Sequence, residues 1–212
     1  MYALYYYPGN ASLTPRMALE EIGAKFGLRL VDRNNDAQKS PDYLRLNPNG
    51  LIPVLVDGEL ALYETAAICL HLADRHPEAR LAPPLGTAAR AEFYKWLIHL
   101  TNTLQPELIT YFYPERRADD AAMAARIKVH AERRVGEMLD RIEAHLQAAG
   151  PHLLGDTFTV ADLFLFMLGR WTRGFTNPAR NRPALRRLME RVTERPAVKR
   201  TLASEGIAAP LF

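Results

Sequence analysis

The chain has 212 residues, 48% of them hydrophobic and 24% charged, and its formal net charge at pH 7 is +3. This composition is typical of a globular protein, and the length allows one large domain or two small ones. No apolar run reaches the ~20 residues of a membrane-spanning helix, and the first residues do not form a secretory signal, so no membrane partner is expected. The single cysteine, Cys69, excludes an intramolecular disulfide framework and predicts a reducing, cytoplasmic environment.

Basic residues are concentrated towards the C-terminus. Between Arg170 and Arg200 the sequence holds ten Lys or Arg and two Glu. Such a stretch can attract nucleic acid, but no zinc-finger, glycine-rich or aromatic-interleaved pattern accompanies it. We therefore interpret it as the solvated face of short helices and expect no nucleic-acid partner.

Residues 1–77 combine strand and helix patterns, so they are predicted to form an α/β domain. Ser40-Pro41 supplies a helix cap followed by proline at the first helical position, and Asp57-Gly58 favours a two-residue hairpin turn. The predicted elements, in chain order, are a strand at 2–7, a helix at 13–26, a strand at 28–31, a short helix from 41, a hairpin at 53–62 and a helix at 65–75. Their order is βαβαββα.

A linker is predicted at residues 78–87, where prolines and a glycine interrupt any helix. Beyond it, residues 88–212 carry apolar side chains at three- and four-residue spacing and are predicted to form an all-α domain. Its two longest helices, predicted at 88–113 and 121–148, are long enough for an antiparallel pair.

One helix start in this second half is marked by its side chains. Thr159 and Asp162 have the spacing of a capping box, in which the acid reaches back to the cap residue. The run at 163–168 is apolar on every face, which predicts a central, buried helix. These residues are therefore interpreted as core and not as part of a reactive site.

Three segments carry a resemblance to a known family: Asn47–Leu55, Leu62–Ile68 and Phe158–Asp162. They are similar to the segment before the cis-proline, the Glu-Ser-x-Ala-Ile signature (here with threonine for serine) and the C-terminal capping motif of cytosolic glutathione transferases. The chain resembles this family over nearly its whole length. The segments that look closest to the bacterial beta class are Leu4–Ser12, Trp171 and Arg191–Ile207. The resemblance implies an α/β thioredoxin-like N-terminal domain followed by an all-α helical-bundle C-terminal domain.

The resemblance also implies a site for glutathione as co-substrate. A cis Ile52-Pro53 bond would turn the Ile52 backbone groups towards an extended peptide, and the helix start at Glu64-Thr65 would suit the γ-glutamyl carboxylate. The six histidines show no metal-ligand spacing, so no metal is expected. The glutathione-binding residues implied are Lys39 and Gln38 for the glycine carboxylate, Ile52 and Pro53 for the backbone, and Glu64 and Thr65 for the γ-glutamyl end.

The turn from Tyr7 to Ser12 lies where a predicted strand ends and a helix begins, so free N–H groups and polar side chains gather there. The resemblance implies that this turn holds the glutathione sulfur as a thiolate. The beta-class cysteine is replaced here by Ala11, and that class's histidine and lysine by Ile109 and Thr110, so its thiol–disulfide chemistry is not implied. Ser12, which matches a serine of that class, is the first choice of hydrogen-bond donor to the sulfur, and Asn10 and Tyr6 remain as alternatives, with Tyr5 as a weaker choice.

The activity that the resemblance implies is glutathione S-transferase activity in a homodimer, with the thiolate attacking a small apolar electrophile in detoxification. Two alternatives remain: a glutathione-dependent disulfide reductase or peroxidase, and a non-catalytic binding or scaffold protein on the same fold. Cys69 has apolar neighbours and is interpreted as core. The aromatic residues expected beside the electrophile are Tyr111, Tyr113 and Trp171, with Phe112 and Phe175 nearby.

Overall fold

The computed structural model describes residues 1–212, which fall into two units. The first unit holds residues 1–84 and 193–209, and the second holds residues 85–192 and 210–212. The C-terminal residues 193–209 therefore group with the N-terminal residues, although 108 residues of the other unit separate them in the chain. No helix combines the length and the apolar character needed to cross a membrane.

The first unit is built on a four-stranded sheet with the strand order β2-β1-β3-β4. β1 pairs parallel with β2 and antiparallel with β3, and β3 pairs antiparallel with β4. The predicted hairpin is confirmed, and Gly58 in its turn has the positive φ of +63° that glycine allows. The strands are β1 (Tyr2–Tyr6), β2 (Phe26–Leu30), β3 (Val54–Asp57) and β4 (Leu60–Tyr63).

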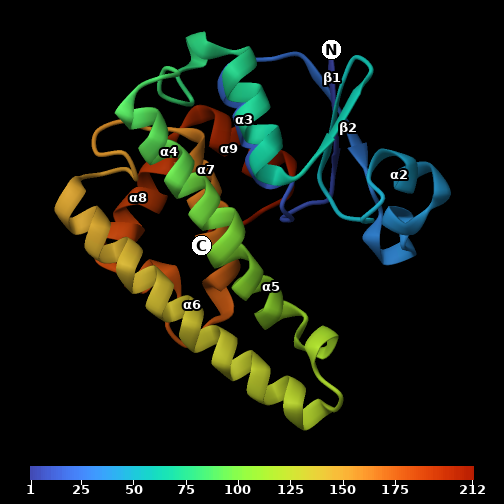
Figure 1. The fold of residues 1–212 in the computed structure, drawn as a ribbon, viewed down its shortest axis with the longest axis vertical. Coiled ribbons are helices and arrows are strands. Elements are labelled where there is room, and N and C mark those ends of the chain that lie inside the picture. The colour runs from blue at the N-terminus through green and yellow to red at the C-terminus, as the bar shows by residue number, and fades with distance from the viewer. The chain divides into compact units, whose positions relative to one another are not determined.

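Four α-helices complete this unit: α1 (Leu13–Ile22), α2 (Pro41–Leu46), α3 (Thr65–Arg75) and α9 (Pro196–Ser204). Figure 1 shows α2 and α3 on opposite sides of the strands, while α1 packs against both α3 and α9. The predicted order βαβαββα is confirmed. The predicted extent of the first helix, 13–26, is wrong at its C-terminal end: Gly23 adopts a left-handed conformation at φ +70°, and Phe26 already belongs to β2.

The second unit is all helical, as predicted: α4 (Ala88–His99), α5 (Gln105–Phe112), α6 (Ala121–Ala149), α7 (Val160–Trp171) and α8 (Pro183–Glu194). The single helix predicted at 88–113 is interrupted by a π-helical turn at Leu100–Leu104. Pro106 explains the interruption, because proline has no N–H for the residue 102 carbonyl and its ring displaces that carbonyl. α5 and α6 run side by side as the predicted antiparallel pair (Figure 1).

The predicted capping box at the start of α7 is confirmed. The Asp162 carboxylate accepts hydrogen bonds from the Thr159 N–H at 2.8 Å and the Leu153 N–H at 2.9 Å, while the Thr159 hydroxyl accepts one from the Ala161 N–H. Every residue of α7 is buried, so the prediction of a central helix is confirmed as well. The polar side chains at this helix start therefore pair with backbone N–H groups of the protein and serve its structure.

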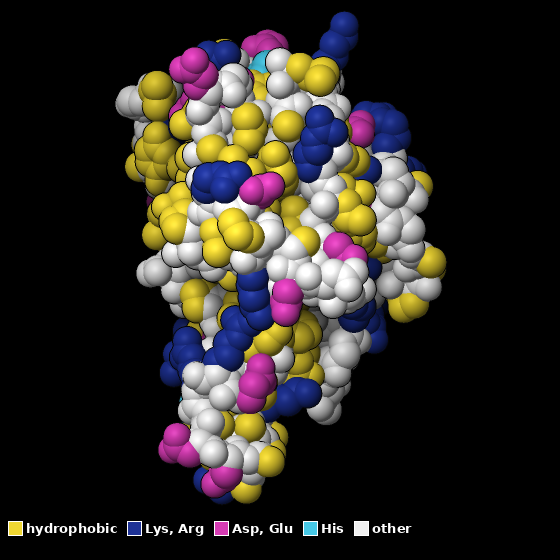
Figure 2. All heavy atoms as spheres, turned by 90° about the vertical axis from the view of Figure 1, so that its right-hand side faces the viewer, with side chains coloured by type: hydrophobic (Ala, Val, Ile, Leu, Met, Phe, Trp, Pro, Cys, Tyr) yellow, Lys and Arg dark blue, Asp and Glu magenta, His cyan; other side chains and the backbone are white.

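The basic stretch from Arg170 to Arg200 was interpreted as a solvated face, but part of it is buried and hydrogen-bonded within the chain. Arg170 and Arg182 are buried, and Arg182 donates to the Asp140 carboxylate at 2.7 Å and to the Gly136 carbonyl at 3.0 Å. Arg195 and Arg200 pair with Glu21 and Glu20 of α1, so much of this positive charge is used within the chain. Acidic and basic side chains are also interspersed on the face of the molecule drawn in Figure 2.

Candidate functional site

The turn from Tyr7 to Ser12 joins β1 to α1 and is closed by the Ser12 side chain. The Ser12 hydroxyl accepts a hydrogen bond from the Tyr7 N–H at 3.2 Å and donates one to the Tyr7 carbonyl at 3.1 Å. Its exposed fraction is 0%, and it makes no capping bond to α1. The Leu13 N–H, the first of α1, donates instead to the Asn10 carbonyl at 3.0 Å, while the Ser12 hydroxyl holds the turn together.

Asn10 lies at the middle of the same turn and is half-buried. Its N–H donates to the Tyr7 carbonyl at 3.2 Å, and its side-chain Oδ1 accepts from the Ala11 N–H at 2.5 Å. This arrangement leaves the Nδ2 amide group of Asn10 without a hydrogen bond within the chain. Tyr6, the third predicted donor, places its ring against the guanidinium of buried Arg16, at 5.3 Å from the ring centroid.

The Ile52-Pro53 peptide bond is cis, as predicted. The Leu51 carbonyl before it is held by two donors, the Tyr43 hydroxyl at 2.8 Å and the Asn47 side-chain amide at 2.7 Å. Burial, and secondly the nearby Tyr5, raises the pKa of Tyr43, so its hydroxyl stays protonated and can donate. The Ile52 N–H and C=O make no backbone hydrogen bond within the chain, so they are available to an added strand.

The start of α3 has an irregular backbone. Glu64 is exposed and has φ +73° and ψ 116°, a conformation that costs a residue with a side chain on the order of 1–3 kcal/mol. No side chain caps α3, so its first N–H groups are also left without a side-chain partner. Thr65 is buried, and its hydroxyl donates to the Ala11 carbonyl at 3.4 Å. This bond joins the start of α3 to the turn between β1 and α1.

The strand register explains why these separate segments meet. Val54 pairs with Tyr5 on one side and with Tyr63 on the other. The segments that follow β1, precede β3 and follow β4 therefore lie at the same end of the sheet. The three polar segments brought together in this way are the turn at 7–12, the cis peptide at 52–53 and the helix start at 64–65.

Lys39 and Gln38 lie in the short helical turn η2 (Ala37–Lys39). Both side chains contact the Asp36 carboxylate, the Lys39 ammonium at 3.1 Å and the Gln38 amide at 3.0 Å. The η2 backbone passes close to Gly50, where an added Cβ would lie 3.1 Å from the Gln38 carbonyl oxygen. The turn therefore lies beside the segment before the cis peptide, but the Lys39 charge is already paired at a 69% exposed side chain.

In the second unit, the aromatic residues predicted to contact an electrophile form one connected set, with the exception of Tyr113. The Tyr111 ring lies 4.3 Å from the ring of buried Phe175 and 5.2 Å from that of Phe112, which is 43% exposed. Phe112 in turn contacts buried Trp171 at 6.3 Å. Tyr113 instead stacks with the Arg116 guanidinium at 4.1 Å. Trp171 is thus part of the core of this unit, and Phe112 and Tyr111 supply its accessible aromatic surface.

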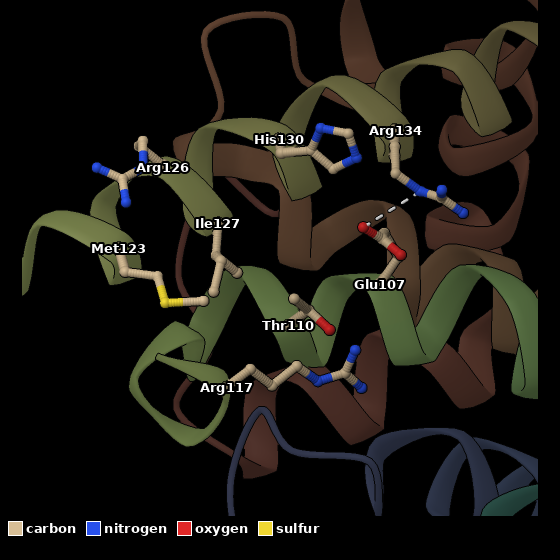
Figure 3. Close-up of a pocket in the computed structure, with 8 residues that line it drawn as sticks. All are labelled: Glu107, Thr110, Arg117, Met123, Arg126, Ile127, His130 and Arg134. Atoms are coloured by element: carbon tan, nitrogen blue, oxygen red, sulfur yellow. Dashed lines mark ion pairs between the residues drawn. The ribbon is translucent and has the colours of Figure 1, made fainter. Parts of the chain in front are cut away.

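A groove of about 680 Å³ between α5 and α6 was not foreseen from the sequence (Figure 3). An ion pair between Glu107 and Arg134, 3.4 Å apart, crosses it. The signal that could have revealed it is the spacing of Arg126, His130 and Arg134, four residues apart on one face of α6. The lining residues are Glu107, Thr110, Arg117, Met123, Arg126, Ile127, His130 and Arg134.

Cys69 lies inside α3 and is fully buried. Burial raises the pKa of its thiol well above the ordinary value, so it stays protonated and unreactive. The structure contains no group of three or more His, Cys, Asp or Glu side chains that could hold a metal ion. Any thiolate chemistry at this site must therefore use a sulfur that a ligand supplies.

Comparisons with known proteins agree along the chain. Models of the glutathione S-transferase N-terminal and C-terminal domains match residues 1–74 and 104–205. Glutathione S-transferase GST-4.5 from Xanthomonas campestris pv. campestris is 33% identical over 96% of this chain and 98% of its own length. A glutathione transferase homologue from Sulfitobacter, solved with bound glutathione, has a TM-score of 0.89 at 26% identity, covering 98% of this chain and 99% of its own. A beta-class glutathione S-transferase from Sphingomonas chungbukensis has a TM-score of 0.85 at 31% identity, covering 97% of this chain and 100% of its own.

Proposed function

This chain belongs to the glutathione S-transferase family, and on that premise we propose that it binds glutathione in its first unit and transfers the thiolate to a small apolar electrophile. One observation carries the proposal. The strand register gathers the turn at 7–12, the Ile52 backbone and the uncapped start of α3 at one end of the sheet. These supply, in one place, donors for a sulfur, for a peptide backbone and for a carboxylate.

The tripeptide binds as an added strand. Its backbone pairs with the free N–H and C=O of Ile52, and its γ-glutamyl carboxylate takes the first N–H groups of α3, where the helix dipole favours negative charge. The exposed Glu64 carboxylate accepts from the γ-glutamyl ammonium. Lys39, with Gln38 beside it, faces the glycine carboxylate and exchanges its present partner Asp36 for this ligand.

The sulfur lies against the turn between β1 and α1. We assign the donor role to Asn10, since its Nδ2 group has no partner within the chain, whereas the Ser12 hydroxyl is buried and used twice. The N-terminal end of the α1 dipole adds positive potential, which lowers the pKa of a nearby thiol. Ala11 offers no thiol and Cys69 is buried, so the nucleophile is the sulfur of glutathione itself.

The second substrate meets the accessible aromatic surface of Tyr111 and Phe112, which suits an apolar group. The protein acts in the cytoplasm in detoxification, as a homodimer. The dimer is supported by the exposed apolar side chains of α4, where Ile98 is 52% exposed and Tyr94 is also accessible. Light scattering at several protein concentrations tests the oligomeric state.

Calorimetric titration with glutathione, followed by a conjugation assay with chlorodinitrobenzene, tests the function. We expect one glutathione bound per chain and a rate of conjugation well above the uncatalysed rate. Assays with a glutathione mixed disulfide and an organic hydroperoxide separate transferase from reductase or peroxidase activity. Absence of glutathione binding would overturn the proposal, and binding with disulfide reduction alone would replace it with the reductase.

A further inference from the structure

A buried carboxylate from the C-terminal end of the chain reaches the turn between β1 and α1. Glu205 follows α9, and its Oε2 accepts a hydrogen bond from the Gly9 N–H at 2.8 Å across 196 residues of sequence. Its Oε1 accepts from Nη1 of Arg16 at 3.1 Å, and the exposed fractions of these two side chains are 0% and 4%. The second guanidinium nitrogen, Nη2, donates to the Ser204 hydroxyl. All these groups belong to the first unit.

The contact falls where the turn is least constrained by its own sequence. Gly9 has φ +67°, and an added Cβ there would meet nothing within 4 Å, so its side-chain position is not crowded. Glycine has the greatest backbone freedom of any residue, so a partner is needed to fix its peptide plane. The Gly9 N–H belongs to the Pro8–Gly9 peptide, so its bond to Glu205 fixes the orientation of this peptide directly before Asn10.

Arg16 keeps this contact compatible with a thiolate. A bare carboxylate one residue from the sulfur-binding position would repel the anion and disfavour its formation. The Arg16 guanidinium pairs with Glu205 and lies against the Tyr6 ring, so the carboxylate is neutralised where it is buried. The pair can hold the turn without opposing the charge of the sulfur.

We propose that Glu205 is a positioning residue, which acts through the Gly9 N–H to hold Asn10 where its amide donates to the glutathione thiolate. The inference rests on the proposed function, because it assigns a purpose to the turn only if glutathione binds there. Arg16 is the counter-charge that makes the buried carboxylate tolerable. The C-terminal segment is thus part of the thiolate site and not only a helix packed on α1.

The chain offers a matched control for simple helix docking. Glu21 of α1 binds Arg195 through two hydrogen bonds of 2.6 and 2.8 Å, so this pair also fastens the C-terminal segment to α1. It does not touch the turn. If the only task of Glu205 were to dock α9, the substitution Glu21→Gln would disturb glutathione chemistry in the same way.

The test compares two double variants that differ only at residue 205. Arg16→Met with Glu205→Gln keeps an acceptor for the Gly9 N–H, whereas Arg16→Met with Glu205→Leu removes it. Replacing both members of a buried pair avoids an isolated buried charge, so both variants are expected to fold. The readouts are the pH titration of bound glutathione, followed by the ultraviolet absorbance of its thiolate, together with kcat and KM for conjugation.

Loss of the acceptor should lower kcat by about 3- to 10-fold and shift the thiol titration to higher pH, with KM for glutathione changed by less than about 2-fold. Glu21→Gln should leave the titration unchanged. The inference is overturned if the two double variants titrate alike, or if Glu21→Gln shifts the titration as far. A wild-type protein that binds no glutathione would overturn the proposed function and this inference together, which is a different result.

The Gly9 amide gives a second measure that needs no ligand. In the full chain its hydrogen exchange should be slow in the wild type and in the Gln variant, and at least about 10-fold faster in the Leu variant. A Gly9 amide that exchanges at the same rate in all three proteins would show that the contact does not constrain the turn, and would overturn the inference.

Discussion

Helices in this chain begin in two different ways. α7 starts with a complete capping box, and α2, α4 and α6 each start with a serine, threonine or aspartate side chain that accepts a backbone N–H. α1 and α3 start without a side-chain cap, although residues 12 and 64 could supply one. α5 and α9 also lack a side-chain cap: α5 continues directly from the π-helical turn at Leu100–Leu104, and α9 has proline at its first position.

The difference separates helix starts that serve the fold from helix starts that serve a ligand. A cap satisfies part of a helix's first N–H groups with the protein's own side chain, so a capped start offers less to an anion than an uncapped one. At α1 the Ser12 hydroxyl instead bonds back to Tyr7, and at α3 the Glu64 carboxylate makes no hydrogen bond to the helix backbone. Both uncapped starts lie at the end of the sheet where an anionic sulfur and a carboxylate are proposed to bind.

The largest expected effect is on the capped side of this comparison. Asp162→Ala removes the acceptor for two buried backbone N–H groups, those of Thr159 and Leu153, and each orphaned group is costly. We expect the free energy of unfolding to fall by about 3–5 kcal/mol, measured by denaturant titration. Asp156→Ala is the control, because Asp156 is exposed a few residues earlier, and it should change the stability little.

A loss of less than about 1 kcal/mol for Asp162→Ala would contradict the view that this helix start is structural. Glutathione affinity should be unchanged in both variants, because the capping box lies in the second unit. A change in affinity without a change in stability would remove the distinction between the two kinds of helix start.

The next effect tests the uncapped start of α1. Asn10→Ala should lower kcat by about 10- to 100-fold with little change in KM for glutathione, because the lost amide acts mainly on the thiolate. Ser12→Ala should instead lower the stability by about 1–3 kcal/mol, since it leaves the Tyr7 N–H unpaired, with a smaller loss in kcat. The reverse pattern, with kcat falling most in the serine variant, would move the donor role back to Ser12.

How much of this site could be predicted depends on the distance in sequence between its parts. The cis peptide at Ile52-Pro53 and the capping box at Thr159 are confirmed because each is encoded within a few neighbouring residues. The interruption of the helix before Pro106 could have been inferred from the proline, but the apolar periodicity that continues through it concealed the break. The contact between Glu205 and Gly9 could not be predicted, because it depends on how two distant segments fold together.

The strand register adds what local patterns cannot. Residues 10, 52 and 64 are each recognisable as polar or irregular positions, but nothing near any of them states that they share one end of the sheet. The same limit applies to Ser12. From the sequence its hydroxyl could serve a ligand, but in the folded turn it is hydrogen-bonded to Tyr7. Side-chain roles at a site are thus harder to predict than the location of the site.

A smaller effect is expected where the chain supplies its own carboxylate to a helix start. Glu143 of α6 accepts hydrogen bonds from the Ala184 and Leu185 N–H groups at the start of α8, at 2.9 and 2.8 Å. Burial raises the pKa of Glu143, but these two bonds, and a third from Gln147, outweigh it and leave the pKa below its ordinary value. The charged form therefore stabilises the fold above the ordinary pKa, and this stability is lost as the pH falls through the lowered pKa.

Glu143→Gln should lower the free energy of unfolding at neutral pH by about 1–2 kcal/mol, since the amide can accept only part of what the carboxylate accepts. The loss should shrink as the pH falls through the lowered pKa of Glu143, because the wild-type carboxylate is then protonated. Denaturant titrations across this pH range measure both. A loss that is independent of pH would mean that the charge of Glu143 does not contribute.

The smallest expected change in stability concerns Glu64, whose variants separate an effect on stability from an effect on glutathione binding. Glu64→Gly should be more stable than Glu64→Ala by about 1 kcal/mol, because only glycine adopts φ +73° without strain. Both variants lose the carboxylate, so both should bind glutathione about 10-fold more weakly than the wild type. Arg80 has φ +54° away from the site, so its glycine and alanine variants should show a similar stability difference with unchanged affinity. If Glu64→Gly bound glutathione as tightly as the wild type, the Glu64 carboxylate would have no part in binding the γ-glutamyl ammonium.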